Sequence, residues 1–346
     1  MTAQKPRGTF WKYGKFLAMA LLLVIGLSMV ALGVLAWFME RPMPLSSTYR
    51  LTVPRGATLS QMAAKLEEDR LIPDKRLLTL SARWMGGGNS IKAGRYRFEP
   101  GVTPLDVIDR LSSGAMEMTQ IRVIEGMTFE DFKKQIRASP DLNNTVVDQS
   151  NAEIMRSLGA VEMSPEGLFF PDTYTLASGS DDIVLLKMAY QALKNRLTQA
   201  WMSRREGLPV GTPYEALILA SIVEKETGAN DDRALVASVL MNRLKAGMKL
   251  QVDPTVIYGL GSDFTGTLRK AHLRQDTPYN TYTRAGLPPT PIALPSQASI
   301  NAVMQAPDTK YYYFVARGDG TSEFSENLAA HNQAVSRYIL RRGARP

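Results

Sequence analysis

Two glutamates at the end of an apolar run are the residues most suited to chemistry. Glu224 and Glu226 close a nearly unbroken apolar stretch at 216–223, which predicts a buried helix. The C-terminal end of a helix disfavours negative charge, and a general acid must carry a proton when its substrate arrives. The pair therefore indicates acid–base chemistry. The alternative is two solvated helix-end charges, paired with Arg233 or Arg243.

The two glutamates are not expected to share a site. Side chains two residues apart on a helix point roughly 200° away from each other. Behind Glu224 lie the small residues Ala220 and Ser221, whereas the side chains behind Glu226 are bulky. A substrate approaches more easily over a small face, so this pattern favours Glu224 as the catalytic residue.

Aromatic and amide side chains follow in the next segments. Residues 250–252 alternate as an extended segment would, Pro254 interrupts them, and Gln251, Asp253 and Thr255 are expected on one face. Flat rings and amides are suited to sugar rings and to their hydroxyl and acetamido groups. The candidate substrate-binding residues are Gln251, Asp253, Tyr258, Asn280, Tyr282 and Asn327. Each could equally hold a loop, and Asp253 in particular is expected to be structural.

Three segments that precede the apolar run share one pattern. Alternating residues lead to glycine, one further residue and threonine at Gly56–Thr58, at 101–103 and at 126–128. An acid or amide follows each threonine by three residues, which predicts a capping box at a helix start. Residues from 50 to about 140 are therefore predicted to form strand–turn–helix units. They resemble LysM-type carbohydrate-binding modules, although such corners are also common in other folds.

The N-terminal region predicts a single membrane span. Residues 16–39 contain no charge, and about 20 apolar residues suffice to cross the hydrocarbon core as a helix. Trp37 and Phe38 suit the membrane interface better than a signal-peptide cleavage site. The basic residues of 1–15 place the N-terminus in the cytoplasm and the remaining chain outside it. A buried core helix is the alternative.

Composition excludes several classes of protein. The chain has 346 residues and a formal net charge of +8, but its basic residues are dispersed, which argues against nucleic-acid binding. Without cysteine there is no disulfide, thiolate metal site or cysteine nucleophile. The two histidines, His272 and His331, lack metalloprotease-type spacing, so a histidine–metal hydrolase is disfavoured. No metal and no cofactor are predicted.

Several motifs in order resemble one family, the endolytic murein transglycosylases or YceG-like family. The similar segments are residues 217–227 (LILASIVEKET), 250–258 (LQVDPTVIY), 279–282 (YNTY), 286–289 (GLPP), 167–174 (GLFFPDTY) and 327–332 (NLAAHN). The resemblance covers essentially the whole chain.

The resemblance implies a lyase that cleaves the bond between N-acetylmuramic acid and N-acetylglucosamine within peptidoglycan strands, leaving 1,6-anhydro ends. It implies Glu224 as the catalytic residue, an inner-membrane location and penicillin-binding peptidoglycan synthases as partners. The expected architecture is α+β, with a cytoplasmic tail (1–15), a transmembrane helix (16–39), a LysM-like region (45–120) and a mixed α+β catalytic domain (121–342).

Two other functions are compatible with parts of the sequence. A hydrolytic muramidase would need a second carboxylate, for which Asp253 and Asp172 are the candidates. A peptidoglycan-binding scaffold of the synthesis machinery would need the repeated units but not the Glu224 constellation. Because the chain has both, an enzyme is favoured.

Overall fold

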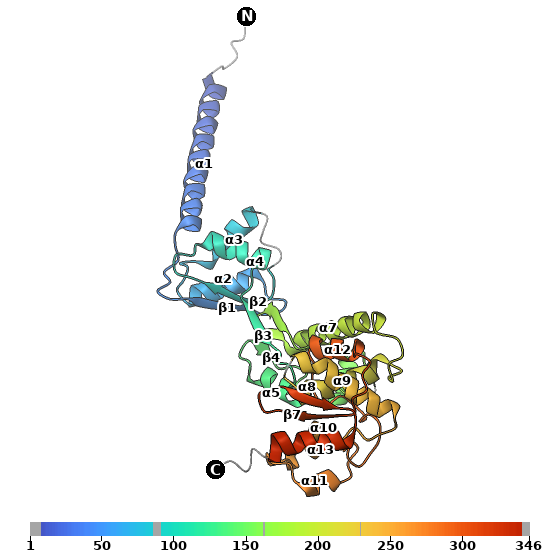
Figure 1. The fold of residues 1–346 in the computed structure, drawn as a ribbon. Coiled ribbons are helices and arrows are strands. Elements are labelled where there is room, and N and C mark those ends of the chain that lie inside the picture. Colours follow the sequence, from blue (N-terminus) through green and yellow to red (C-terminus); the bar gives the residue numbers. More distant parts are fainter. Residues whose placement is uncertain (1–7, 86–90, 162, 229, 341–346) are drawn as a thin grey trace, which may run out of the picture. The chain divides into compact units, whose positions relative to one another are not determined.

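The computed structural model describes residues 8–85, 91–161, 163–228 and 230–340, and the chain divides into two compact units (Figure 1). The first unit comprises Met1–Thr119 and Ala177–Gly179, and the second Gln120–Leu176 and Ser180–Pro346. Residues 1–7 of the predicted tail and 341–342 of the predicted catalytic domain lie outside the described residues. Helices and short strands are mixed in both units, which confirms the α+β class.

The first unit is a two-stranded antiparallel sheet with helices packed against it. Its elements are α1 (Gly8–Glu40), β1 (Tyr49–Val53), α2 (Leu59–Glu68), α3 (Lys75–Trp84), β2 (Gly94–Phe98) and α4 (Pro104–Ser113). Leu51 of β1 lies opposite Tyr96 of β2. Both are buried in an apolar core with Leu66, Phe98 and Leu111. Alternate residues of each strand therefore face the helices.

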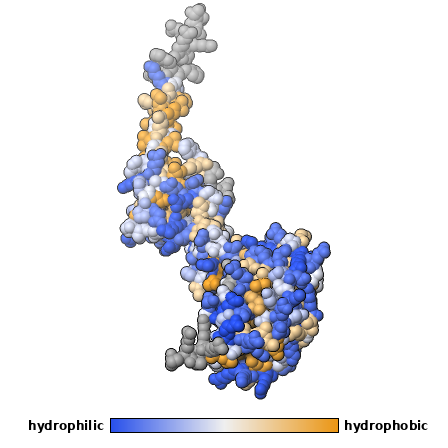
Figure 2. All heavy atoms as spheres, viewed as in Figure 1, coloured by the Kyte–Doolittle hydropathy of each residue, from blue (hydrophilic) through white to orange (hydrophobic). Residues whose placement is uncertain are grey.

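Helix α1 is long and apolar enough to cross a membrane. The candidate span is Tyr13–Glu40, which contains the predicted 16–39. Its apolar side chains are exposed along most of the helix, as Figure 2 shows. Only its last turn packs into the first unit, where Phe38 and Met39 join the core. Over most of its length α1 is thus unlike a buried core helix.

The repeated strand–turn–helix pattern is confirmed at all three positions. Thr58, Thr103 and Thr128 are the N-caps of α2, α4 and α5 (Phe129–Ala138), and each forms a complete capping box. The preceding glycines have φ values of 77°, 96° and 73°. These values lie in the left-handed region that glycine tolerates best. The sequence pattern therefore correctly predicts the turn and the helix start at each of the three positions.

The second unit surrounds a buried central helix, α8 (Pro213–Glu226). Its other elements are β3 (Met118–Arg122), α5, β4 (Leu142–Asn143), α6 (Asn151–Ser157), β5 (Thr173–Ala177), β6 (Ser180–Asp181), α7 (Asp182–Met202), α9 (Asn230–Lys245), α10 (Asp253–Leu260), η1 (Gly261–Asp263), α11 (Lys270–Arg274), α12 (Gln297–Met304), β7 (Tyr313–Ala316), β8 (Ser322–Ser325), α13 (Leu328–Val335) and η2 (Ser336–Leu340). Strand β3 pairs with β5, β4 with β6, and β7 with β8. The last pair forms an antiparallel hairpin.

Helix α8 is buried from 216 to 223, as its apolar run predicts. Helices α7, α9, α10 and α12 all pack against it. Thr212 caps its start and Pro213 occupies the first turn. The buried part of α8 ends at Val223, and the two glutamates follow in its partly exposed last turn.

The segment after residue 250 differs from the prediction. It becomes helical at Asp253, because Pro254 stands in the first turn, where its missing N–H costs nothing. Thr255 is fully buried and hydrogen-bonds Thr281 at 2.8 Å, whereas Gln251 and Asp253 are exposed. The expectation that these three polar side chains share one face is therefore wrong.

The capping boxes predict a measurable loss of stability. Thr103→Ala removes the hydroxyl that accepts the Asp106 N–H at 3.2 Å. The first unit should lose about 1 kcal/mol of unfolding free energy, a typical value for an N-cap deletion. Calorimetry in lipid nanodiscs measures this loss. Thr52→Ala, at an exposed strand position, is the control, and an equal loss in both variants would contradict the capping role.

Candidate functional site

The two glutamates at the end of α8 have separate surroundings. Glu224 lies against α12 and the segment before it, whereas Glu226 lies near Asp253 and Arg243. This confirms that they do not share a site. The two carboxyls therefore interact with different sets of neighbouring residues.

Glu224 is held by hydrogen bonds to a single oxygen. Its Oε2 accepts the Ser296 N–H at 2.9 Å, the Ser296 hydroxyl at 2.5 Å and the Ser299 hydroxyl at 2.7 Å. An Arg233 nitrogen lies 3.9 Å from Oε1, and only 6% of the glutamate side chain is exposed. Three donors on one oxygen fix the side chain in a single orientation. Glu224 thereby ties the end of α8 to the start of α12.

The small face behind Glu224 is occupied by the protein itself. Ala220 and Ser221 are almost completely buried. The Ser221 hydroxyl accepts the Ile292 N–H at 3.0 Å, so the chain before α12 runs directly over this face. The small residues allow close packing and do not leave an approach for substrate. This packed face therefore gives no support to Glu224, whose assignment as the catalytic residue stays a prediction.

Glu224 nevertheless lines a cleft on another side. The cleft has a volume of ≈ 520 Å³, and its walls come from β3, β5 and the segments that follow or precede them. Its lining residues are Arg122, Val123, Ile124, Glu125, Pro171, Asp172, Thr173 and Glu224. Asp172, a candidate second carboxylate, is thus in the same cleft as Glu224, and it pairs with Arg196 at 3.6 Å. This arrangement keeps a two-carboxylate site open as an alternative.

Glu226 has the protonation behaviour that a general acid needs. The pKa of its carboxyl is raised to about 7, chiefly by burial and also by the negative charge of Asp253, while Arg243 opposes both. The Glu226 residue as a whole is partly exposed. A carboxyl with a pKa near neutrality can both give and take a proton under working conditions.

Arg243 fixes the backbone around Glu226. Its guanidinium donates to the carbonyls of Tyr312 and Leu250, both at 2.7 Å, and is 3.5 Å from the Gln251 Oε1. It also lies over the Tyr313 ring, 5.2 Å from the centroid. The arginine is buried. It therefore joins α9, the segment before α10 and β7 into one rigid support.

Two of the predicted substrate-binding residues lie near Glu226, and a third lies beside Arg243. The Tyr282 hydroxyl donates to Asp253 at 2.6 Å. Burial and Asp253 raise the Tyr282 pKa, and the charge of Glu226 contributes to the same effect. Gln251 has a φ of 53°, which is uncommon for a residue other than glycine. Such strained backbone is concentrated at ligand sites.

The other three predicted residues make contacts that hold the fold. Asn280 is buried, and its amide donates to the carbonyls of His272, Leu273 and Gln275. The Asn327 side chain caps α13. The Tyr258 hydroxyl donates to Glu166 at 3.0 Å, and its ring meets Tyr279 edge to face at 4.8 Å. Asp253 and Tyr282 thus lie near Glu226 and Gln251 lies beside Arg243, whereas Asn280, Asn327 and Tyr258 make their contacts in other parts of the fold.

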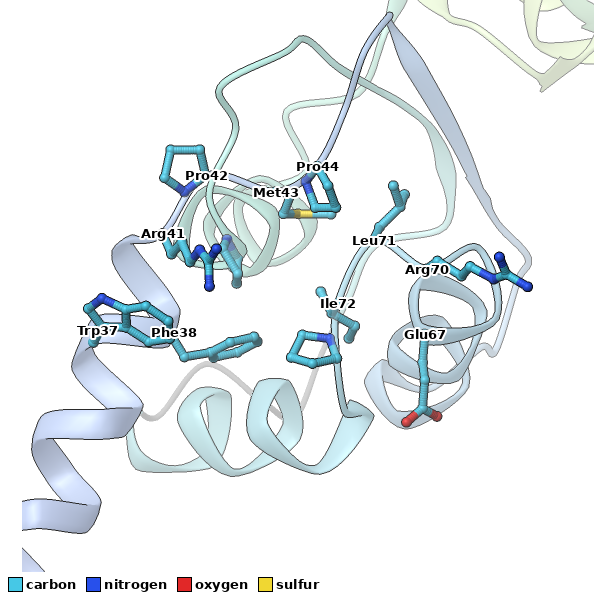
Figure 3. A pocket seen from close by; sticks show the side chains of 12 residues that line it. Trp37, Phe38, Arg41, Pro42, Met43, Pro44, Glu67, Arg70, Leu71 and Ile72 are labelled. Atoms are coloured by element: carbon cyan, nitrogen blue, oxygen red, sulfur yellow. The ribbon is translucent and has the colours of Figure 1, made fainter.

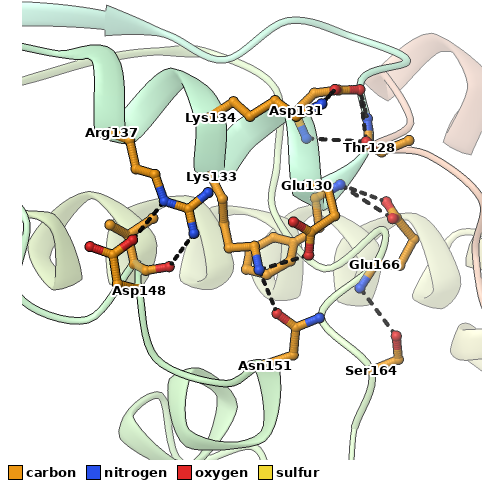
Figure 4. A network of polar contacts seen from close by, with 12 residues as sticks. Thr128, Glu130, Asp131, Lys133, Lys134, Arg137, Asp148, Asn151, Ser164 and Glu166 are labelled. Carbon is orange, nitrogen blue, oxygen red and sulfur yellow. Dashed lines mark hydrogen bonds and ion pairs between the residues drawn. The ribbon is translucent and has the colours of Figure 1, made fainter. Parts of the chain in front are cut away.

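Glu166 is a buried carboxyl that the sequence reasoning missed. It accepts the Phe129 N–H at 3.0 and 3.2 Å and the Tyr258 hydroxyl at 3.0 Å. Burial raises its pKa to about 7. Figure 4 shows its carboxylate turned toward the start of α5, beside the separate Lys133–Glu130 and Arg137–Asp148 pairs. Its position directly before the 167–174 motif was the available signal.

Comparisons with known proteins agree with this architecture. The model of the YceG-like family matches residues 51–337. A protein of Bacillus subtilis named endolytic murein transglycosylase is 30% identical over 311 residues, covering 85% of each chain. A protein of the same name from Streptococcus pneumoniae is 25% identical, covering 83% of this chain and 58% of its own length.

A solved structure supports the same conclusion. The crystal structure of a YceG-like protein from Listeria monocytogenes matches with a TM-score of 0.50 and 25% identity, covering 84% of this chain and 99% of that one. The chain belongs to the YceG-like family. The predicted family is confirmed, and its named relatives are lytic transglycosylases, as expected of the predicted lyase class.

Glu166 predicts a specific pH dependence of stability. Its pKa is raised on folding, so the folded state binds more protons than the unfolded state between about pH 4.5 and 7. Stability from this group is present at low pH and declines as pH rises to about 7, by an amount on the order of 2–3 kcal/mol. Glu166→Gln should therefore flatten the fall in melting temperature between pH 5 and pH 7.5.

A matched control separates this effect from a general loss of packing. Glu153 caps α6, and its hydrogen bonds to Ser150 lower its pKa, so its stabilising contribution is lost only at more acidic pH. Glu153→Gln should leave the slope between pH 5 and 7.5 unchanged. A wild-type slope in Glu166→Gln would contradict the assignment.

Proposed function

We propose that this chain is a membrane-anchored, endolytic lytic transglycosylase of peptidoglycan, with Glu226 as its general acid and base. Family membership and the names of the relatives support the reaction class. The resemblance to the family implies Glu224 as the catalytic residue, whereas the carboxyl with a raised pKa of about 7 at the end of α8, near Asp253, is that of Glu226, and this observation supports Glu226 in the proposal. The substrate is the bond between N-acetylmuramic acid and N-acetylglucosamine within a glycan strand.

The proposed reaction needs one carboxyl in two successive roles. Protonated Glu226 gives its proton to the glycosidic oxygen, the C1–O bond breaks, and an oxocarbenium-like centre develops on the muramoyl sugar. The carboxylate then takes the proton of the sugar's own C6 hydroxyl as that oxygen bonds to C1. The product carries a 1,6-anhydro ring, no water is consumed, and the enzyme recovers its proton.

The neighbours of Glu226 have distinct proposed roles. Asp253 keeps the glutamate protonated by its charge and orients Tyr282 through the hydrogen bond of 2.6 Å. Gln251 and Tyr282 are proposed to contact the acetamido groups and hydroxyls of the sugars. Arg243 holds the backbone of this wall in position.

The remaining candidates act at a distance in this proposal. Asn280 keeps the loop that carries Tyr282 in position, since its Oδ1 accepts the Tyr282 N–H at 2.8 Å. Tyr258 and Asn327 position α10 and α13. Glu224 fixes the last turn of α8, from which Glu226 projects.

The proposed location and domain organisation of the chain are based on its first unit. Helix α1 is proposed as a single-pass inner-membrane anchor with the N-terminus in the cytoplasm, because the basic residues lie before it. Residues 45–120 form a LysM-like glycan-holding region and 121–342 the catalytic domain. An enzyme tethered in this way would trim or terminate nascent strands. Penicillin-binding synthases are its proposed partners.

A hydrolytic muramidase is the second candidate, and one observation favours it. Glu224 and Asp172 line the same cleft, as the two carboxyls of a hydrolase do. In that reaction Glu224 would be the acid and water the nucleophile, so the product would lack the anhydro ring. A non-enzymatic scaffold would instead bind strands without altering them.

Paired variants separate the two glutamates. Glu226→Gln should fold normally and lose at least about 100-fold of the activity, because general acid–base catalysis contributes on the order of 10²–10⁴-fold. Glu224→Gln keeps an oxygen for the Ser296 and Ser299 donors and should retain most of it. The measurement is mass analysis of products released from purified sacculi, scored for anhydro ends. Full activity in Glu226→Gln with loss in Glu224→Gln would reverse the assignment, and reducing ends without the anhydro ring would favour the hydrolase.

Asp253 predicts a shift in the pH profile. Its charge raises the pKa of Glu226, so removing the charge lowers that pKa. Activity declines as the general acid ionises, and Asp253→Asn should therefore move the alkaline limb of the profile to lower pH. Asparagine still offers Oδ1 to the Tyr282 hydroxyl. A profile that falls in height without moving would show that Asp253 acts only on structure.

A further inference from the structure

Helix α3 exposes large apolar side chains beside the membrane-spanning helix. Trp84 is 75% exposed, Leu80 55% and Met85 49%. Leu80 and Trp84 are four residues apart and so lie on one face of the helix. The opposite face, with Leu78 and Ala82, is buried in the first unit. Large exposed apolar side chains gathered at one end of a short helix are unusual for a surface in water.

Trp84 and Met85 line a groove together with α1. The groove has a volume of ≈ 510 Å³. Leu32, Gly33, Leu35, Ala36, Met39 and Glu40 of α1 form one wall, Ser81, Trp84 and Met85 the other, and Leu105 completes it. Apart from Glu40 and Ser81, this lining is apolar. The exposed end of α3 is therefore continuous with the surface that α1 presents to lipid.

The length of α1 places this groove at membrane depth. The 28 residues of Tyr13–Glu40 extend over ~42 Å as a helix, about the thickness of a bilayer with its headgroup layers. Leu32 precedes Glu40 by eight residues, or ~12 Å of helix rise. The wall opposite Trp84 and Met85 thus extends from the headgroup layer into the hydrocarbon.

The last turn of α1 independently marks the interface. The Arg41 guanidinium lies over the Trp37 ring at 4.9 Å, and both residues appear at the end of the helix in Figure 3. Tryptophan and arginine side by side are typical of the headgroup layer. Lys75, Arg76 and Arg83 of α3 are exposed. A short helix that combines exposed basic and apolar residues has the character of an interfacial helix.

The geometry points to a second membrane contact, in which the C-terminal end of α3 inserts Trp84 and Met85 into the outer leaflet and a lipid chain occupies the groove against α1. This inference rests on the proposed anchor but concerns a different surface. The first unit is then seated on the bilayer instead of moving freely at the end of α1. The basic residues of α3 add attraction for anionic headgroups.

The absence of cysteine makes the test direct, because each single-cysteine variant carries one label. Met85→Cys, Val24→Cys in the span and Thr52→Cys at an exposed strand position are labelled with a nitroxide. The full-length chain is placed in vesicles of phosphatidylethanolamine and phosphatidylglycerol. Collision with oxygen, which concentrates in lipid, is compared with collision with a water-soluble nickel complex. The Met85 label should favour oxygen, as the Val24 label does, and the Thr52 label should favour nickel.

Each outcome decides between separate claims. A Met85 label that behaves like Thr52 while Val24 stays in lipid overturns the second contact and leaves the anchor intact. A Met85 label shielded from both reagents indicates a protein partner and also overturns it. A Val24 label in water overturns the anchor and the second contact together. Trp84→Glu should move the Met85 label toward water, whereas Thr52→Glu should not.

Discussion

The proposed site depends on a carboxyl at the C-terminal end of α8 whose ionisation is opposed by its surroundings. Negative charge is unfavourable there for two reasons, since the helix dipole and the loss of water both oppose it. Glu226 responds with a pKa raised to about 7. A nearby carboxylate, Asp253, strengthens the effect, and the buried Arg243 prevents it from becoming larger. The protein thus stabilises a protonated acid close to neutrality.

The rest of the site serves to hold that carboxyl in place. The chain before α12 packs over the small residues of α8, where the Ser221 hydroxyl accepts the Ile292 N–H. Glu224 completes this contact through Ser296 and Ser299. Two neighbouring glutamates therefore have opposite characters. Glu224 accepts three hydrogen bonds on one oxygen, and Glu226 has a pKa raised by burial.

Local features were predictable from sequence, and long-range ones were not. The capping boxes at Thr58, Thr103 and Thr128 depend on residues three apart, so their pattern is complete in the sequence. The apolar run of α8 likewise predicted its burial. The choice between Glu224 and Glu226 depends on which face of α8 meets α12, some 70 residues later. Small residues are equally compatible with an open face and a tightly packed one, and only the fold separates them.

The same limit explains the substrate-binding candidates. Residue type suggested Gln251, Tyr282 and Asn280 alike, but Asn280 is buried, and its amide donates to three backbone carbonyls. Glu166 escaped notice because a single acid in a loop has no distinctive spacing. Its importance comes from Phe129 and Tyr258, which are distant in sequence.

The most direct test of this account is an infrared titration of the protonated carboxyl. The carbonyl stretch of a carboxylic acid disappears on ionisation, and subtracting the Glu226→Gln spectrum from wild type removes every other acid, including Glu166. The account predicts that the band in this difference spectrum fades with a midpoint near pH 7. The same band is expected when the Glu226→Gln spectrum is subtracted from that of Glu224→Gln instead of wild type. A band that fades near pH 4.5, the ordinary value for glutamate, would contradict it.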